Sequence, residues 1–140
     1  MKEILFRGLR TDMPKWVEGF YVHLHKSTYC FIGEGGPDNE IHRIAFEEMT
    51  DCGLPNHHLW ADVDPKTVGQ YIGIEDINHK KIFEGDLVTI PGSKRQGLPA
   101  TVRWNKDLCA FTLHRNGYNE ILFDSEGETK YEVTGNIYGV

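Results

Sequence analysis

Residues 81–90 read Lys-Ile-Phe-Glu-Gly-Asp-Leu-Val-Thr-Ile, and this stretch decides the fold class. Two short runs of β-forming residues, Ile82-Phe83 and Leu87–Ile90, flank Gly85 and Asp86. Gly85 permits a tight bend, and the Asp86 carboxylate can accept backbone N–H bonds within it. The stretch therefore predicts two short strands joined by a tight turn, which is typical of a mainly β protein.

The same pattern continues through the C-terminal half of the chain. Asn116-Gly117 is a hairpin signal, because both residues tolerate a positive φ. Gly135 lies inside an apolar run and predicts a β-bulge or a close approach of another backbone. The other strands that we expect here are 71–74, 100–104, 110–114, 121–123 and 131–138. Strands this short, each bounded by Gly, Pro or Asn, indicate a small barrel or sandwich.

The N-terminal half carries β-forming segments as well, at 3–9, 16–25, 28–32 and 58–63. Only two polar residues separate 16–25 from 28–32, so the two segments predict a hairpin. Alternate side chains of a strand share a face. One face of 16–25 then carries Phe20, Val22 and Leu24, and the other carries Tyr21, His23 and His25.

Residues 41–49 admit two interpretations. The apolar side chains fit one face of a helix that Gly53 would end. The spacing of Ile44 and Phe46 and the shortness of the run fit a strand as well. We favour the strand and keep the helix as the alternative, because periodicity discriminates least in short apolar runs.

A capped turn at Asp64 and Pro65 gives the best boundary in the chain. The Asp64 side chain suits the position before a helical turn, and Pro65 suits the first position within it. Gly69 would end the turn so that the next strand can begin. We therefore expect an N-terminal β region over 1–63 and a small domain over 64–140, the two packed as one unit.

The overall composition excludes several classes of protein. The chain has 140 residues, 39% of them hydrophobic and 26% charged, with a net charge of −6. These values exclude a collagen, a coiled coil and a basic protein that wraps nucleic acid. No run approaches the ~20 apolar residues of a membrane span, and the first residues are too polar for a secretory signal. We expect a cytoplasmic protein with no membrane partner.

The cysteine and histidine spacing predicts no metal site. Cys30, Cys52 and Cys109 have no paired spacing, and we expect them to be reduced, partly buried thiols. His23 and His25 share one strand face about 7 Å apart. Two ligands do not make a zinc site, and the Cys52, His57 and His58 group matches no ligand motif. We therefore expect these histidines to be solvated or hydrogen-bonded.

Catalytic motifs of the common kinds are absent from the sequence. The glycines of 33–36 are not followed by a phosphate-binding lysine, and no serine stands in a nucleophile elbow. A dinucleotide fold needs a long helix that the chain does not show. Carboxylate pairs such as Glu47-Glu48 are typical of solvated surfaces. We expect no enzyme and no cofactor.

A basic stretch leaves nucleic-acid binding as an alternative function. It contains Lys94, Arg95, Arg103 and Lys106, with Trp104 among them. Small barrels bind single strands through basic groups interleaved with exposed aromatic side chains. The negative net charge opposes this function, and so does the strand face of Trp104, which predicts a core position.

Three runs of sequence, with Arg7-Gly8 and Trp16 near the start, carry a resemblance to a known family. They are Asp-Pro-Lys-Thr-Val-Gly-Gln-Tyr-Ile-Gly at 64–73, Ile-Phe-Glu-Gly-Asp-Leu-Val at 82–88 and Glu-Val-Thr-Gly-Asn-Ile-Tyr at 132–138. Together they resemble the YopX family over most of the chain. His79 departs from the family pattern, since it stands in a turn where glycine is expected. A positive φ there would be tolerated at some cost.

The resemblance implies a fold and an origin. The expected fold is mainly β, with an irregular N-terminal β half, a C-terminal SH3-like small barrel and little helix. The expected origin is a bacteriophage or prophage, and the resemblance implies no activity, cofactor or catalytic residue. SH3-like barrels present loops and edge strands to peptides. We therefore expect a non-enzymatic accessory protein that binds another protein or a second copy of itself.

Overall fold

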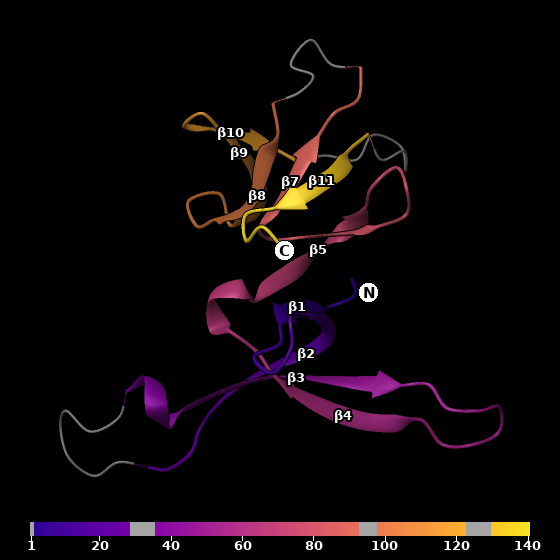
Figure 1. Cartoon of the computed structure of the whole chain (residues 1–140). Helices are drawn as coiled ribbons and strands as arrows, with labels where there is room; N and C mark the ends of the chain where they lie inside the picture. The colour runs from indigo at the N-terminus through magenta and orange to yellow at the C-terminus, as the bar shows by residue number, and fades with distance from the viewer. Residues whose placement is uncertain (1, 29–35, 93–97, 123–129) are drawn as a thin grey trace. The chain divides into compact units, whose positions relative to one another are not determined.

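The computed structural model describes residues 2–28, 36–92, 98–122 and 130–140, and within them the chain is mainly β (Figure 1). This confirms the prediction of a mainly β chain with little helix. Two 3₁₀ turns are the helical elements of the described residues, and every strand pairing described below is antiparallel. None of the helical elements in the described ranges is long and apolar enough to cross a membrane.

The chain divides into two compact units. Leu5–Val68 forms one, and Gly69–Val140 together with Met1–Ile4 forms the other. We call them the N-terminal unit and the C-terminal unit.

The N-terminal unit is an antiparallel sheet in the order β4-β3-β2-β1. Alternate side chains of β3 pack inward, and Ile44 is completely buried against Val17, Ala61 and Val63. The elements of the N-terminal unit are β1 (Phe6–Leu9), β2 (Trp16–His25), η1 (Pro37–Asn39), β3 (Glu40–Glu48), β4 (His57–Asp62) and η2 (Pro65–Thr67).

Strand β3 resolves the ambiguity of residues 41–49 in favour of the strand. It pairs with β2 from Glu40 to Ala45 and with β4 from Arg43 to Glu48. A helix could have buried Ile44 too, but it would have removed the strand with which β4 and residues 20–25 of β2 form their backbone hydrogen bonds. The expected partner of 16–25, the segment 28–32, lies mostly outside the described residues.

The C-terminal unit contains a five-stranded sheet in the order β10-β9-β8-β7-β11, and β5 pairs with β6 (Figure 1). Its core is formed by Ile82, Val88, Ala100, Val102, Leu113 and Tyr131. Its strands are β5 (Gly69–Glu75), β6 (Lys81–Phe83), β7 (Asp86–Thr89), β8 (Ala100–Asn105), β9 (Ala110–Arg115), β10 (Tyr118–Ile121) and β11 (Glu132–Asn136).

The turn between β6 and β7 has the geometry that its sequence requires. Gly85 has a φ of +88°, a conformation that side chains rarely adopt. The Asp86 carboxylate accepts a buried hydrogen bond of 2.9 Å from the backbone N–H of Phe83. The backbone N–H of Gly85 donates to the carbonyl of Val102 in β8, at 2.9 Å. The turn thus joins β6, β7 and β8 at one point.

Asp64 and Gly69 stand at either end of the short turn η2. The Asp64 side chain accepts the N–H of Lys66 at 3.0 Å, and Pro65 occupies the first helical position. The turn ends at Val68, and Gly69 is the first residue of β5. A Cβ at Gly69 would collide with the carbonyl oxygen of Glu84, so this glycine allows two backbones to approach closely.

Gly135 marks a bulge in β11. The register of β11 against β7 shifts between Val133 and Gly135, which is one of the two outcomes expected for that glycine. A side chain at Gly135 would meet nothing closer than Leu87 Cδ1 at 4.0 Å. The other outcome, a close approach of another backbone, is therefore not what the position serves.

The hairpin at Asn116-Gly117 begins its second strand earlier than the sequence predicts. Both residues have a positive φ, +48° and +83°, and Arg115 pairs directly with Tyr118. Strand β10 therefore occupies Tyr118–Ile121, whereas the apolar run had placed it at 121–123. In a two-residue hairpin pairing starts at the turn itself, whatever the polarity of the next side chains.

Candidate functional site

One face of the sheet formed by β2, β3 and β4 carries large apolar side chains in contact with solvent. The register places Phe20 opposite Ala45, and Ala45 opposite Trp60, so the three share one face. Leu24 pairs with Ile41 on the same face. Phe20, Leu24 and Trp60 are 66%, 55% and 59% exposed. We call these five residues the apolar sheet face.

An ion pair lies within this face. Arg43 stands between Ile41 and Ala45 in β3 and is the cross-strand partner of Asp62 in β4. The distance from Arg43 Nε to Asp62 Oδ1 is 2.6 Å, and both side chains are exposed. The charges neutralise each other within the N-terminal unit, so the face combines apolar area with one internally balanced pair.

The opposite face of β2 and β3 carries a group of imidazoles around a carboxylate. His23 is the cross-strand partner of His42, and His25 is the partner of Glu40. Glu40 Oε2 lies 3.0 Å from His42 Nε2 and 3.8 Å from His23 Nε2. Nitrogen or oxygen atoms of His23, Glu40 and His42 all lie within 4.8 Å of one another. We call these three residues the histidine cluster.

Tyr21 makes a hydrogen bond to His42 that orients the ring of this histidine in the cluster. Its hydroxyl oxygen lies 2.6 Å from His42 Nδ1. Partial burial, and then the charge of Glu40, raise the pKa of Tyr21, so the hydroxyl keeps its proton near neutral pH. The hydrogen bond with His42, followed by the nearby imidazoles, lowers the pKa of Glu40. The cluster therefore holds an ionised carboxylate between two rings.

Sequence reasoning identified only part of this cluster. His23 was visible as a strand-face residue with His25, but two histidines alone predicted no site. The structure adds Glu40 and His42 because β3 is a strand in register with β2. His57 and His58, by contrast, are adjacent residues of β4 and point to opposite faces. The missing signal was the pairing of residues 16–25 with 40–48.

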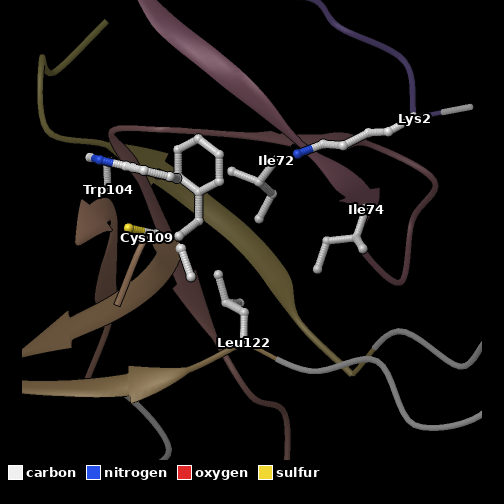
Figure 2. Close-up of a pocket in the computed structure, with 8 residues that line it drawn as sticks. Lys2, Ile72, Ile74, Trp104, Cys109 and Leu122 are labelled. Atoms are coloured by element: carbon white, nitrogen blue, oxygen red, sulfur yellow. The ribbon is translucent and has the colours of Figure 1, made fainter. Parts of the chain in front are cut away.

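The C-terminal unit has a pocket of about 290 Å³ above its core. Figure 2 shows Ile72 and Ile74 from β5 and Leu122 pointing into it, with Trp104 and Cys109 at one side. The Nζ of Lys2 lies 5.5 Å from the ring centre of Phe111, which also lines the pocket. Lys2 is the one charged side chain among the described lining residues.

Two expectations about side-chain burial are corrected. Trp104 is 50% exposed and packs edge-on against Phe111 with ring centres 5.2 Å apart, whereas the strand face predicted a core position. Val102, two residues earlier, does reach the core, so the core ends before Trp104. Cys52 and Cys109 are free and exposed instead of partly buried, and Cys30 lies outside the described residues.

The basic stretch is only partly described. Lys94 and Arg95 lie outside the described residues. Arg103 is exposed in β8 and alternates with Trp104, so the two side chains point to opposite faces. Lys106 is exposed in the turn that follows. The described part therefore does not interleave Arg103 with the exposed tryptophan on one surface.

Comparison with known proteins identifies a family for this chain. A family model described as YopX protein matches residues 5–139 of the chain. A search of curated proteins finds no match.

Proposed function

The chain belongs to the YopX family, and we propose that this member is a phage- or prophage-encoded accessory protein that acts by binding another protein. The observation that carries the proposal is the apolar sheet face, with Phe20, Leu24 and Trp60 each more than half exposed. Monomeric proteins rarely leave such side chains together in water unless a partner covers them.

The composition of the face suits protein binding. Aromatic side chains are enriched at the centres of protein interfaces, where tryptophan and tyrosine are frequent hot spots. Covering one such side chain fully contributes about 1.5–3 kcal/mol. The Arg43–Asp62 pair is satisfied internally at 2.6 Å, so a partner can cover it without supplying a counter-charge.

The pocket of the C-terminal unit also suits a protein partner. The described lining is apolar and aromatic, with the Lys2 ammonium and the Cys109 thiol as its titratable groups. Such a lining fits an apolar side chain of a partner better than a reacting polar substrate.

The test is a pair of substitutions on the apolar sheet face, Phe20→Ala with Trp60→Ala, compared with Tyr118→Ala as a control. Tyr118 is 76% exposed in the C-terminal unit, so it tests the loss of an exposed aromatic elsewhere. Light scattering over a range of concentrations reports self-association. A photo-crosslinking residue placed at position 24 reports other partners in cells of the natural host.

We expect the double variant to lose self-association or the position-24 crosslinks, while Tyr118→Ala keeps them. All substituted side chains are largely exposed, so folding stability should change by no more than about 0.5 kcal/mol each. Partner binding that survives unchanged in the double variant would exclude this face. A wild-type chain that neither self-associates nor crosslinks would reject the proposal itself.

A further inference from the structure

We propose that the histidine cluster is a binding site for a divalent first-row transition ion of the zinc class, held by His23, Glu40 and His42. The inference concerns the face of β2 and β3 opposite to the apolar sheet face, and it is independent of the protein-binding proposal. It rests on three donor atoms that two paired strands bring to one place.

The distances fit a small ion. Zinc binds imidazole nitrogen and carboxylate oxygen at about 2.0–2.2 Å, so two ligand atoms on a tetrahedral ion lie about 3.4 Å apart. The separations from Glu40 Oε2 are 3.0 Å to His42 Nε2 and 3.8 Å to His23 Nε2, on either side of this value. The donor atoms of the remaining pair, His23 and His42, lie within 4.8 Å of each other, so the side chains must rotate to bring all three atoms to bonding distance of one ion.

The ligand types point to the class of metal. Two imidazoles and one carboxylate suit zinc, iron, cobalt or nickel better than calcium or magnesium, which prefer oxygen ligands. Zinc sites with three protein ligands usually keep one position open for water. Glu40 and His23 are partly exposed, with side chains 38% and 43% accessible, so an ion can enter from solvent.

Tyr21 supplies the outer support that metal-bound histidines usually have. A ligating ring commonly makes a hydrogen bond through its other nitrogen, which fixes its orientation. Tyr21 Oη stands 2.6 Å from His42 Nδ1 and leaves Nε2 facing Glu40. When an ion occupies Nε2, the ring proton must sit on Nδ1, and this N–H can donate a hydrogen bond to the hydroxyl oxygen of Tyr21.

His25 offers a candidate for a fourth ligand. It is the cross-strand partner of Glu40, and its ring centre lies 5.4 Å from that of His23. The alternative occupant of the fourth position is water. A His25→Ala variant separates the two, since only a ligating His25 would change the coordination spectrum.

The experiment uses the full chain, freed of any affinity tag and stripped of metal with a chelator. Zinc chloride is titrated by calorimetry near neutral pH, and Co²⁺ is used as a spectroscopic probe of the ligand set. The test variants are His42→Ala and Glu40→Gln. The control is His58→Ala, which removes an exposed histidine from the same sheet on its opposite face.

We expect one equivalent of zinc to bind, at least tenfold more weakly in either test variant and unchanged in the control. Glu40→Gln nearly preserves side-chain size at a partly exposed position, so a folded variant with weakened binding separates ligand loss from unfolding. The melting temperature without metal checks this. An absence of saturable zinc binding by the wild type would overturn the proposal, as would equal losses in His58→Ala.

Discussion

Asp76 provides the sharpest test of how the C-terminal unit is held together. It is 3% exposed and sits in the turn between β5 and β6. Its Oδ1 accepts the backbone N–H groups of Asn78 at 2.8 Å and Lys80 at 2.9 Å, and its Oδ2 accepts that of Val133 in β11 at 3.1 Å. One carboxylate thus links a local turn to the last strand, and Asp76→Ala removes all three bonds.

The expected loss follows from where each amide would lie afterwards. A hydrogen bond to a charged group contributes about 1.5–3 kcal/mol. Asn78 and Lys80 are exposed, so water can replace the carboxylate at their amides, and we count about 0.5 kcal/mol for each. The Val133 amide is in a strand and partly buried, so we count about 2 kcal/mol for it. Asp76→Ala should therefore lower the free energy of unfolding by about 3 kcal/mol.

Urea denaturation followed by circular dichroism measures this loss, and amide hydrogen exchange in β7 and β11 localises it. The control is Asp107→Ala, an exposed aspartate in the turn between β8 and β9 of the same unit. We expect the control to change the free energy of unfolding by less than about 0.5 kcal/mol. A loss in Asp76→Ala below about 1 kcal/mol, or one equal to that of the control, would refute the reasoning.

The pH dependence gives a second readout. Burial alone would raise the pKa of Asp76, but its three backbone hydrogen bonds outweigh burial and lower it below the ordinary value of 3.8. A lowered pKa in the folded state contributes stability at pH values above the unfolded pKa, and this contribution is lost as the pH falls through the folded pKa. The difference in stability between wild type and Asp76→Ala should therefore be constant near neutral pH and shrink below about pH 4.

Three further predictions follow from the two units. Gly19→Ala should destabilise the N-terminal unit by about 3 kcal/mol, because the added Cβ would collide with the backbone carbonyl of Ala45. Thermal melts should show no such loss for the control Gly36→Ala, because a Cβ at Gly36 would meet only open space. His79→Gly should raise the free energy of unfolding by about 0.5 kcal/mol, since His79 has a φ of +61°, and a lowered melting temperature would contradict this. Fluorescence anisotropy with a single-stranded oligonucleotide at low ionic strength should show no saturable binding, because the side chains of Arg103 and Trp104 lie on opposite faces of β8. Salt-sensitive binding would restore the nucleic-acid alternative.

Local chemistry made several of the turns predictable from sequence. Gly85 and the Asn116-Gly117 pair adopt positive φ, and those conformations follow from residue type alone. The capped turn at Asp64 is equally local, since its side chain bonds an amide two residues away. Turns of this kind fix where strands begin and end, so most strand positions could be predicted.

Features that depend on distant residues could not be predicted in the same way. The histidine cluster needs His23 opposite His42, and this pairing depends on the register of β2 against β3. No two-residue turn fixes that register, because residues 26–39 separate the two strands in the sequence. A shift of one residue would have turned His42 to the other face of the sheet.

How deeply side chains near the ends of strands are buried also could not be predicted from the sequence. Trp104 continues the alternation of Ala100 and Val102, yet it is half exposed. Alternation shows which face a side chain occupies, but how far the core extends along that face depends on the elements packed against it. The same holds for Phe20 and Trp60, whose exposure on a regular strand face is visible only in three dimensions.

The ion pair between Arg43 and Asp62 constrains how the apolar sheet face can evolve. While both residues are present, the pair is neutral at a separation of 2.6 Å. Loss of either one alone would leave a single charge amid Phe20, Ala45 and Trp60, and a partner covering that charge would have to bear the cost of its burial. Under the proposed protein-binding function, positions 43 and 62 should therefore change together among relatives that keep the same partner. Where only one has changed, the partner should have changed as well.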